Sequence, residues 1–204
     1  MRNKIIEIAN DMFLNLGFKS VTMDDIANNL GVSKKTIYKY FTNKTALVEA
    51  STLHTFETIS HGIDCVCELD DNPIDEIFAI KKLVMEHLKD EKSSPQYQLQ
   101  KYYPKIFSDL KQKQFELMQG CVINNLNRGK ALGVYRENID VEFISRIYFT
   151  GIVGIKDKEM FPLKNYSMKT LMNYYLEYHL RGICTPKGIE QLEHQLEKQT
   201  IIYE

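Results

Sequence analysis

Residues 22–41, with the sequence TMDDIANNLGVSKKTIYKYF, constrain the fold of this chain more than any other segment. Thr22 is a good helix N-cap, and Asp25 stands three residues later, where an acidic side chain completes a capping box. Gly31 predicts a sharp exit from this helix, because glycine tolerates left-handed backbone. Ser33 can cap a second helix directly afterwards. The segment therefore predicts two short helices joined by a tight turn, a helix-turn-helix.

The apolar side chains of this segment recur at helical spacing, so each helix has a buried and an exposed face. Ile26, Ala27 and Leu30 form the inward face of the first helix, and Ile37 and Phe41 that of the second. The outward face of the second helix carries Lys34, Lys35, Thr36, Tyr38 and Lys39. A helix with this face suits the DNA major groove, where cations and hydroxyls reach phosphates and base edges.

The positions of three lysines support a phosphate-binding surface. Lys34 and Lys35 fall in the first turn of the second helix, and Lys44 follows Asn43, the expected cap of the next helix. The helix dipole disfavours a cation at such a position, by about 0.3–1 kcal/mol. A docked phosphate would reverse that penalty. The alternative is that the three lysines are ordinary solvated surface residues.

The first fifty or so residues resemble the N-terminal domain of the TetR/AcrR family of bacterial transcriptional regulators. The resemblance lies in Ile8, Ala9, Phe13, Gly17, Phe18, Thr22, Ile26, Ala27, Gly31, Val32, Ser33, Thr36, Ile37, Tyr38, Tyr40, Phe41, Asn43, Lys44 and Leu47. It implies a homodimer that binds double-stranded DNA through three N-terminal helices. It also implies a larger, divergent domain that binds a small-molecule effector.

The same resemblance implies which side chains contact DNA. Family members touch phosphates at the positions of Thr22, Tyr38, Tyr40 and Lys44. They touch phosphates or base edges at the positions of Ser33, Lys34, Lys35, Thr36 and Lys39. Lys35 departs from the pattern, because many relatives have glycine or another small residue there. We expect Lys39 to contact a base edge, since lysine can donate to guanine O6 and N7.

Composition places the chain among ordinary globular proteins, with 44% hydrophobic and 26% charged residues and a net charge of −1. Charge is unevenly distributed, because the first fifty residues carry seven Lys or Arg against five Asp or Glu. We see no apolar run long enough to span a membrane, and no signal peptide. We therefore expect a cytoplasmic protein without a membrane partner. The four scattered cysteines predict free thiols.

The rest of the chain also reads as helical, so the predicted fold class is all-α. We expect a three-helix head at residues 1–48 and a larger ligand-binding and dimerisation domain at 49–204. In the head, Ile5, Ala9, Phe13 and Leu16 should form an inward stripe. Later helices are expected at about 43–68, from 73, from 95, at about 104–128, over a segment that includes 143–155, and from 167, and a short polar helix is expected to close the chain.

The larger domain is predicted to dimerise and to hold a ligand. The helix that includes residues 143–155 and the helix from 167 are broadly apolar, and the family resemblance implies that they form a four-helix interface between two copies. The alternative is burial within one subunit. Aromatic and methionine side chains adapt to varied apolar ligands. The candidate ligand-lining residues are Phe78, Met85, Tyr102, Tyr103, Phe107, Phe115, Met118, Phe143 and Phe149. The alternative is that these side chains are simply core.

No catalytic motif is visible, and we expect neither an enzyme nor a protein-bound cofactor. His61 and Cys65 have the spacing of two metal ligands on one helix face, but no second pair completes a site, so we expect no metal. The resulting hypothesis is a ligand-responsive transcriptional regulator that binds a palindromic operator as a dimer. Repression is favoured, but the sequence does not separate a repressor from an activator. The competing hypotheses are a helical enzyme and a protein-interaction module with a basic head.

Overall fold

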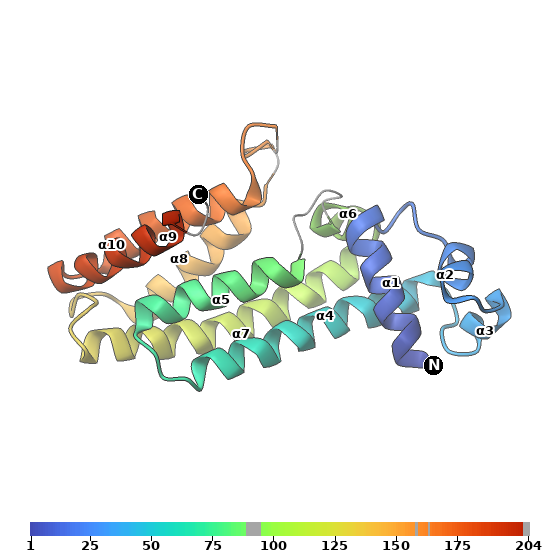
Figure 1. Cartoon of the computed structure of the whole chain (residues 1–204), viewed down its shortest axis with the longest axis horizontal. Helices are drawn as coiled ribbons and strands as arrows, with labels where there is room; N and C mark the ends of the chain where they lie inside the picture. Colours follow the sequence, from blue (N-terminus) through green and yellow to red (C-terminus); the bar gives the residue numbers. More distant parts are fainter. Residues whose placement is uncertain (89–94, 158, 163, 202–204) are drawn as a thin grey trace. The chain divides into compact units, whose positions relative to one another are not determined.

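The computed structural model describes residues 1–88, 95–157, 159–162 and 164–201, and it confirms the all-α fold class. Figure 1 shows the succession of helices along the chain. The helices are α1 (Arg2–Leu16), α2 (Met23–Leu30), α3 (Lys34–Tyr38), α4 (Lys44–Cys67), α5 (Pro73–Leu88), α6 (Pro95–Tyr102), α7 (Pro104–Ala131), α8 (Val141–Gly154), α9 (Met168–Ile183) and α10 (Pro186–Ile201). Among the described residues, none of these helices combines the length and apolarity needed to cross a membrane.

Local capping signals in the sequence set most of the helix starts. The Asn43 side chain accepts a hydrogen bond from the Ala46 backbone N–H at 2.9 Å, at the start of α4. Asp140 caps α8 and Ser167 caps α9 in the same way. The predicted end of α7 near residue 128 is wrong, because the helix continues to Ala131. Caps are local interactions within a few residues, so these starts can be read from the sequence.

The chain forms two compact units, and neither is continuous in sequence. Unit 1 comprises residues 1–62 and 86–114, and unit 2 comprises residues 63–85 and 115–204. A boundary at residue 48 does not separate these units, because α6 and the beginning of α7 belong to the unit that contains the helix-turn-helix. Helices α4 and α7 each contribute residues to both units.

The core of unit 1 is built from the inward faces of α1 to α4 together with one residue of α6. Ile5, Ala9 and Phe13 of α1 are fully buried, as the stripe predicts, and Leu99 of α6 is 3% exposed in the same cluster. Leu16 was predicted to face inward, and this is wrong, because its side chain is 58% exposed. It is the last residue of α1, so the helix ends before that side chain can pack.

Unit 2 has its own apolar core, in which α8 and α9 pack closely. Gly151 lies under the ring of Tyr175, and a Cβ at Gly151 would come within 2.2 Å of that ring. The Tyr175 hydroxyl donates to the backbone carbonyls of Ile147 and Tyr148, at 3.1 and 2.9 Å. The absence of a side chain at Gly151 thus lets α8 and α9 approach closely within one subunit.

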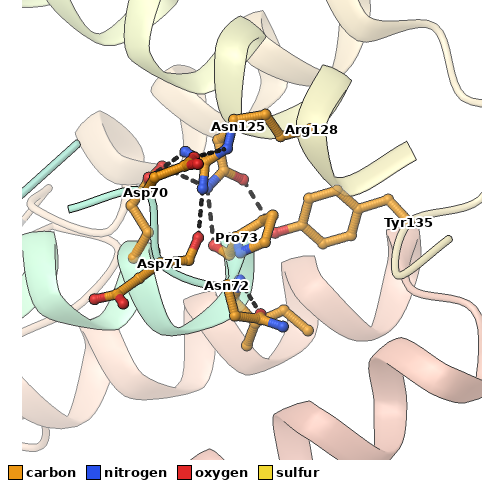
Figure 2. Close-up of polar contacts among 9 residues, drawn as sticks. Asp70, Asp71, Asn72, Pro73, Asn125, Arg128 and Tyr135 are labelled. Atoms are coloured by element: carbon orange, nitrogen blue, oxygen red, sulfur yellow. Dashed lines mark hydrogen bonds and ion pairs between the residues drawn. The ribbon is translucent and has the colours of Figure 1, made fainter. Parts of the chain in front are cut away.

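A buried polar network fastens the start of α5 to α7 (Figure 2). The Glu76 carboxylate, 2% exposed, accepts hydrogen bonds from Asn125 at 2.7 Å and from Arg128 at 2.6 Å. Asn125 also donates to the Pro73 carbonyl at 2.8 Å and accepts from the Tyr135 hydroxyl at 3.0 Å. Because each buried group has a partner, the network can stabilise one arrangement of these helices.

The same arginine ties down the turn between α4 and α5. Arg128 forms an ion pair with Asp70 at 3.2 Å and donates to the backbone carbonyl of Asp71. Asp70 has a positive φ of 52°, a conformation that costs energy for a residue other than glycine. The hydrogen bond to Glu76 raises the pKa of Arg128, so the guanidinium stays charged.

We expect the protein to be less stable in mild acid, because unit 2 contains a buried histidine. His179 is 7% exposed beside the rings of Tyr148 and Tyr175, and burial lowers its pKa to about 4. The unfolded chain protonates this group below about pH 6.5, whereas the folded chain keeps it neutral, so stability falls as pH drops through this range. We expect His179 to contribute a loss of about 2 kcal/mol between pH 7.5 and pH 5, measured by urea unfolding.

The control for this prediction is the His179→Gln variant, which has no group that titrates in this range. Its stability should vary less between pH 7.5 and pH 5 than that of the unchanged protein. Parallel pH profiles for the two proteins would contradict the assignment to His179.

Candidate DNA-binding surface

The helix-turn-helix of α2 and α3 is built by the signals that its sequence carries. The Thr22 hydroxyl accepts from the Asp25 backbone N–H at 3.2 Å, and the Thr22 backbone N–H donates to the Asp25 carboxylate at 2.8 Å, which confirms the capping box. Gly31 ends α2 in the left-handed conformation with φ 65°. Ser33 caps α3 by accepting from the Thr36 N–H at 3.2 Å.

The buried faces of the two helices hold α3 against the rest of unit 1. Ile26 and Ile37 are fully buried, and Ala27 and Phe41 are no more than 4% exposed. Because α3 has only five residues, its orientation depends on this packing rather than on its own helical stability. The opposite face of α3 is consequently fixed in direction.

All nine predicted DNA-contacting residues belong to unit 1, and their side chains lie outside its buried core. The exposed members are Thr22, Ser33, Lys34, Lys35, Tyr38, Lys39 and Tyr40, and the half-buried members are Thr36 and Lys44. Tyr38 is 44% exposed and Tyr40 is 45% exposed, so neither ring serves the core. Lys35 and Lys39 extend from the same short helical segment as Tyr38.

Two of the three lysines at helix starts are already engaged in the free protein. The Lys34 ammonium donates to the Asp24 carboxylate at 2.7 Å, with side chains that are 49% and 57% exposed. The Lys44 ammonium donates to the backbone carbonyl of Lys19 at 3.4 Å. Burial lowers the pKa of Lys44, and the charge of nearby Asp25 opposes that shift. Lys34 is therefore not the freely solvated cation that its position in the sequence indicates.

The hydroxyl groups of the predicted set also have partners within the caps. The Thr22 hydroxyl donates to the Asp25 carboxylate at 2.7 Å, and the Ser33 and Thr36 hydroxyl oxygens are 2.9 Å apart. The first hydrogen bond lowers the pKa of Asp25, which keeps the cap charged. To donate a hydrogen bond to a phosphate, the Thr22 hydroxyl would have to give up its hydrogen bond to the Asp25 carboxylate.

Helix α6 packs against the corner between α1 and α2, a contact that the sequence did not reveal. The Gln98 side chain accepts from the Lys19 backbone N–H at 3.1 Å, and it packs where a Cβ on Gly17 would lie. Gly17 has φ 87°, so the backbone of this corner between α1 and α2 favours glycine, and a Cβ here would also displace the end of the Gln98 side chain. The Lys19 ammonium lies over the Tyr102 ring at 5.5 Å. No local pattern could have indicated contacts across so much of the chain.

The nine candidate ligand-lining residues are divided between the two units. Tyr102, Tyr103 and Phe107 belong to unit 1, where Tyr103 and Phe107 pack against the helix-turn-helix core and Tyr102 is 40% exposed. The other six belong to unit 2: Phe78, Met85, Phe115, Met118, Phe143 and Phe149. Among them, Phe78, Met85 and Met118 belong to or pack against the core, and the Phe115 and Phe149 rings are 5.1 Å apart.

Phe143 differs from the other candidates in unit 2, because its side chain is 60% exposed on the surface of the subunit. Its backbone N–H is held by the Asp140 cap at 2.9 Å, which fixes the register of α8. That register turns Tyr148 and Phe149 inward, with 9% exposure each, and leaves Phe143 and Ile147 outside.

The structure brings together Cys67 and Cys121, which are not the His61 and Cys65 pair whose spacing was considered in the sequence. Cys67, at the end of α4, pairs by a thiol hydrogen bond with Cys121 of α7. Burial raises the pKa of Cys67 to about 12, and the neighbouring Cys121 and Glu76 act in the same direction. A thiol with so high a pKa is a poor nucleophile. Among the described residues, no group of three or more His, Cys, Asp or Glu side chains could hold a metal ion.

Comparisons with known proteins agree with this geometry. Residues 5–51 match the family model described as bacterial regulatory proteins, tetR family. The chain is 30% identical over 152 residues to the HTH-type transcriptional regulator YdeS of Bacillus subtilis, covering 68% of this chain and 69% of YdeS. It is 22% identical over 192 residues to the HTH-type transcriptional repressor KstR2 of Mycolicibacterium smegmatis, covering 92% of each.

A solved structure shows the same fold. The repressor SmeT of the Stenotrophomonas maltophilia multidrug efflux pump SmeDEF superposes with a TM-score of 0.69 at 17% identity, covering 91% of each chain. At this identity the likeness shows the fold alone.

Proposed function

Because the chain belongs to the TetR family of bacterial regulatory proteins, it is a DNA-binding transcriptional regulator, and we propose that it represses its target genes as an effector-responsive homodimer. The observation that carries this proposal is the outward face of α3, where Lys35, Tyr38 and Lys39 are exposed on a helix whose other face is locked into the core. A rigid, cationic helix face of this kind can enter a major groove.

The exposed apolar residues of unit 2 support dimerisation. Phe143 and Ile147 of α8 are 60% and 44% exposed, and Tyr174 and Tyr178 of α9 are 64% and 78% exposed. The two members of each pair are four positions apart, so each pair forms a stripe along one side of its helix. Aromatic side chains this exposed are enriched at protein interfaces. The occupant that we propose for this surface is a second copy of the chain, which would present two copies of α3 to a two-fold symmetric operator.

The proposed effector acts by a shift between two states of the dimer. An effector that binds more tightly to the state with misplaced heads lowers operator affinity by the ratio of its affinities for the two states. Helices α4 and α7 support this proposal, because each runs through both compact units. A displacement of either helix in unit 2 is therefore transmitted along its own backbone.

The experiment that tests this function is selection of binding sites from random duplex DNA. We expect enrichment of an inverted repeat whose half-sites lie about one helical turn, or a multiple of it, apart. Failure to enrich any sequence would contradict the proposal. Retention of an acidic protein without DNA selectivity would favour an interaction module, and turnover of a small molecule without DNA selectivity would favour an enzyme.

Lys39 should contribute to the sequence preference of binding. Replacing Lys39 with alanine removes a candidate donor to guanine and should relax the preference at one position in each half-site, with a discrimination loss of about 1–3 kcal/mol. The measurement compares the affinities of the variant and the unchanged protein for single-base variants of the selected operator.

The matched control is Lys44→Ala, which removes a candidate phosphate contact. It should weaken binding to every sequence alike and reduce the salt slope by about one unit. A Lys39 variant that loses affinity equally for all operator variants would contradict base reading by this side chain.

A further inference from the structure

The ion pair between Asp24 and Lys34 lies on the surface that is proposed to meet DNA. It joins the first turn of α2 to the first residue of α3, with the Lys34 ammonium 2.7 Å from the carboxylate. Both side chains are about half exposed, at 49% for Lys34 and 57% for Asp24. The hydrogen bond to Asp24 raises the pKa of Lys34, so the ammonium stays charged while it is held.

The helix cap does not require Asp24. The capping box consists of Thr22 and Asp25, whose carboxylate takes both the backbone N–H and the hydroxyl of Thr22. Asp24 interacts favourably with the helix dipole at the start of α2, as any acidic residue in the first turn does. Asp25 lies in the same turn and supplies a negative charge there as well. The carboxylate of Asp24 is thus free of the cap and directed at a lysine that is predicted to contact DNA.

A carboxylate in this position opposes the binding of a polyanion. A lysine gains affinity for DNA by approaching a phosphate and displacing its counterion. Asp24 already acts as an intramolecular counterion of Lys34, so a phosphate has to displace or share that carboxylate.

We propose that Asp24 is an affinity-setting residue, which competes with DNA phosphates for Lys34 and so weakens the binding of DNA of any sequence. This inference rests on the proposed function as a DNA-binding regulator. A weaker affinity for DNA also suits control by an effector. An effector typically changes the affinity for DNA by about 5–150-fold. It can therefore release the protein from an operator only when the operator affinity does not greatly exceed the affinity that repression requires.

The test measures DNA binding by fluorescence anisotropy with full-length protein and two labelled probes. One probe is a short duplex of fixed arbitrary sequence, and the other is an operator duplex obtained by selection. Replacing Asp24 with asparagine should tighten binding to both probes by about two- to fivefold at low salt, the range expected for an exposed ion pair. The dependence of affinity on salt should also become steeper, by up to about one unit, because one more lysine then releases a counterion.

The matched control is Glu7→Gln, which removes one exposed negative charge from α1 in the same unit. This variant has the same change in net charge, and it should alter affinity by less than about twofold because separated surface charges are screened. An equal gain for the Asp24 and Glu7 variants would overturn the inference, because net charge alone would then explain it.

A double-mutant cycle with Lys34→Gln isolates the pair. If Asp24 acts through Lys34, the Asp24→Asn substitution should give no more gain than Glu7→Gln when Lys34 is also replaced. A gain that persists in the Lys34→Gln background would overturn the inference. Circular dichroism and thermal unfolding should show an intact head in each variant, because the capping box is unchanged.

The same data separate this inference from the proposed function. If the unchanged protein selects an operator and Asp24→Asn leaves its affinity unaltered, the inference fails and the function stands. If the unchanged protein binds neither duplex, the proposed function itself fails, and the inference falls with it.

Discussion

Replacing both Phe143 and Tyr178 with glutamate is expected to convert the proposed dimer into a monomer and to weaken operator binding by about a hundredfold or more. The substitutions place two charges in the apolar stripes of α8 and α9 that we propose to be buried between subunits. Loss of the second head removes the gain that comes from two linked contacts with one DNA molecule, which is about 10²–10⁴-fold. Analytical ultracentrifugation measures the first effect, and anisotropy on the selected operator measures the second.

Two features make this experiment decisive. Both side chains are largely exposed within one protomer, so the variant should retain its helical content and its binding to a single half-site. Met160→Glu is the matched control, because Met160 is 71% exposed and lies outside α8 and α9. A double variant that remains dimeric, or a Met160 variant with the same loss, would contradict the proposed interface.

Replacing Arg128 with methionine is expected to destabilise the protein by about 3 kcal/mol. The substitution keeps much of the side-chain length but leaves the Glu76 carboxylate, 2% exposed, without its cationic partner. Removing one partner of a buried ion pair typically costs about 3–5 kcal/mol, and the partial exposure of Arg128, at 23%, places this case at the lower end. Urea unfolding followed by circular dichroism measures the loss.

An exposed arginine in the same unit provides the comparison. Arg181 pairs with Glu177 at 2.9 Å and with Glu193 at 3.4 Å, and these side chains are 37–56% exposed. Arg181→Met should therefore cost less than about 1 kcal/mol. Adding Glu76→Gln to the Arg128 variant should restore part of its stability, since the uncompensated charge is then absent. Equal losses at Arg128 and Arg181 would show that burial does not govern these pairs.

The parts of the structure that the sequence predicted are those specified by neighbouring residues. The capping box of Thr22 and Asp25, the left-handed Gly31 and the Ser33 cap each involve residues at most five apart, and all are as expected. The inward positions of Ile37 and Phe41 follow from helical periodicity in the same way. Local chemistry was therefore enough to predict the helix-turn-helix.

The parts that the sequence did not predict depend on tertiary contacts. The Asp24–Lys34 pair joins residues ten apart across a turn, and the hydrogen bond between Gln98 and Lys19 joins residues 79 apart. Neither leaves a periodic signal. The exposure of Phe143 depends on the register that the Asp140 cap gives to α8, and its apolar character alone suggested the interior.

The docking of α6 on the corner between α1 and α2 has a consequence for exchanging heads between regulators. Leu99 fills a place in the core of the DNA-binding unit, and Gln98 packs on Gly17. A chimaera that joined residues 1–48 to the body of another regulator would leave that place vacant, unless the new body brought a helix shaped to fill it. In this protein, a change of operator preference is therefore more readily acquired by point substitution on α3 than by transplanting the head.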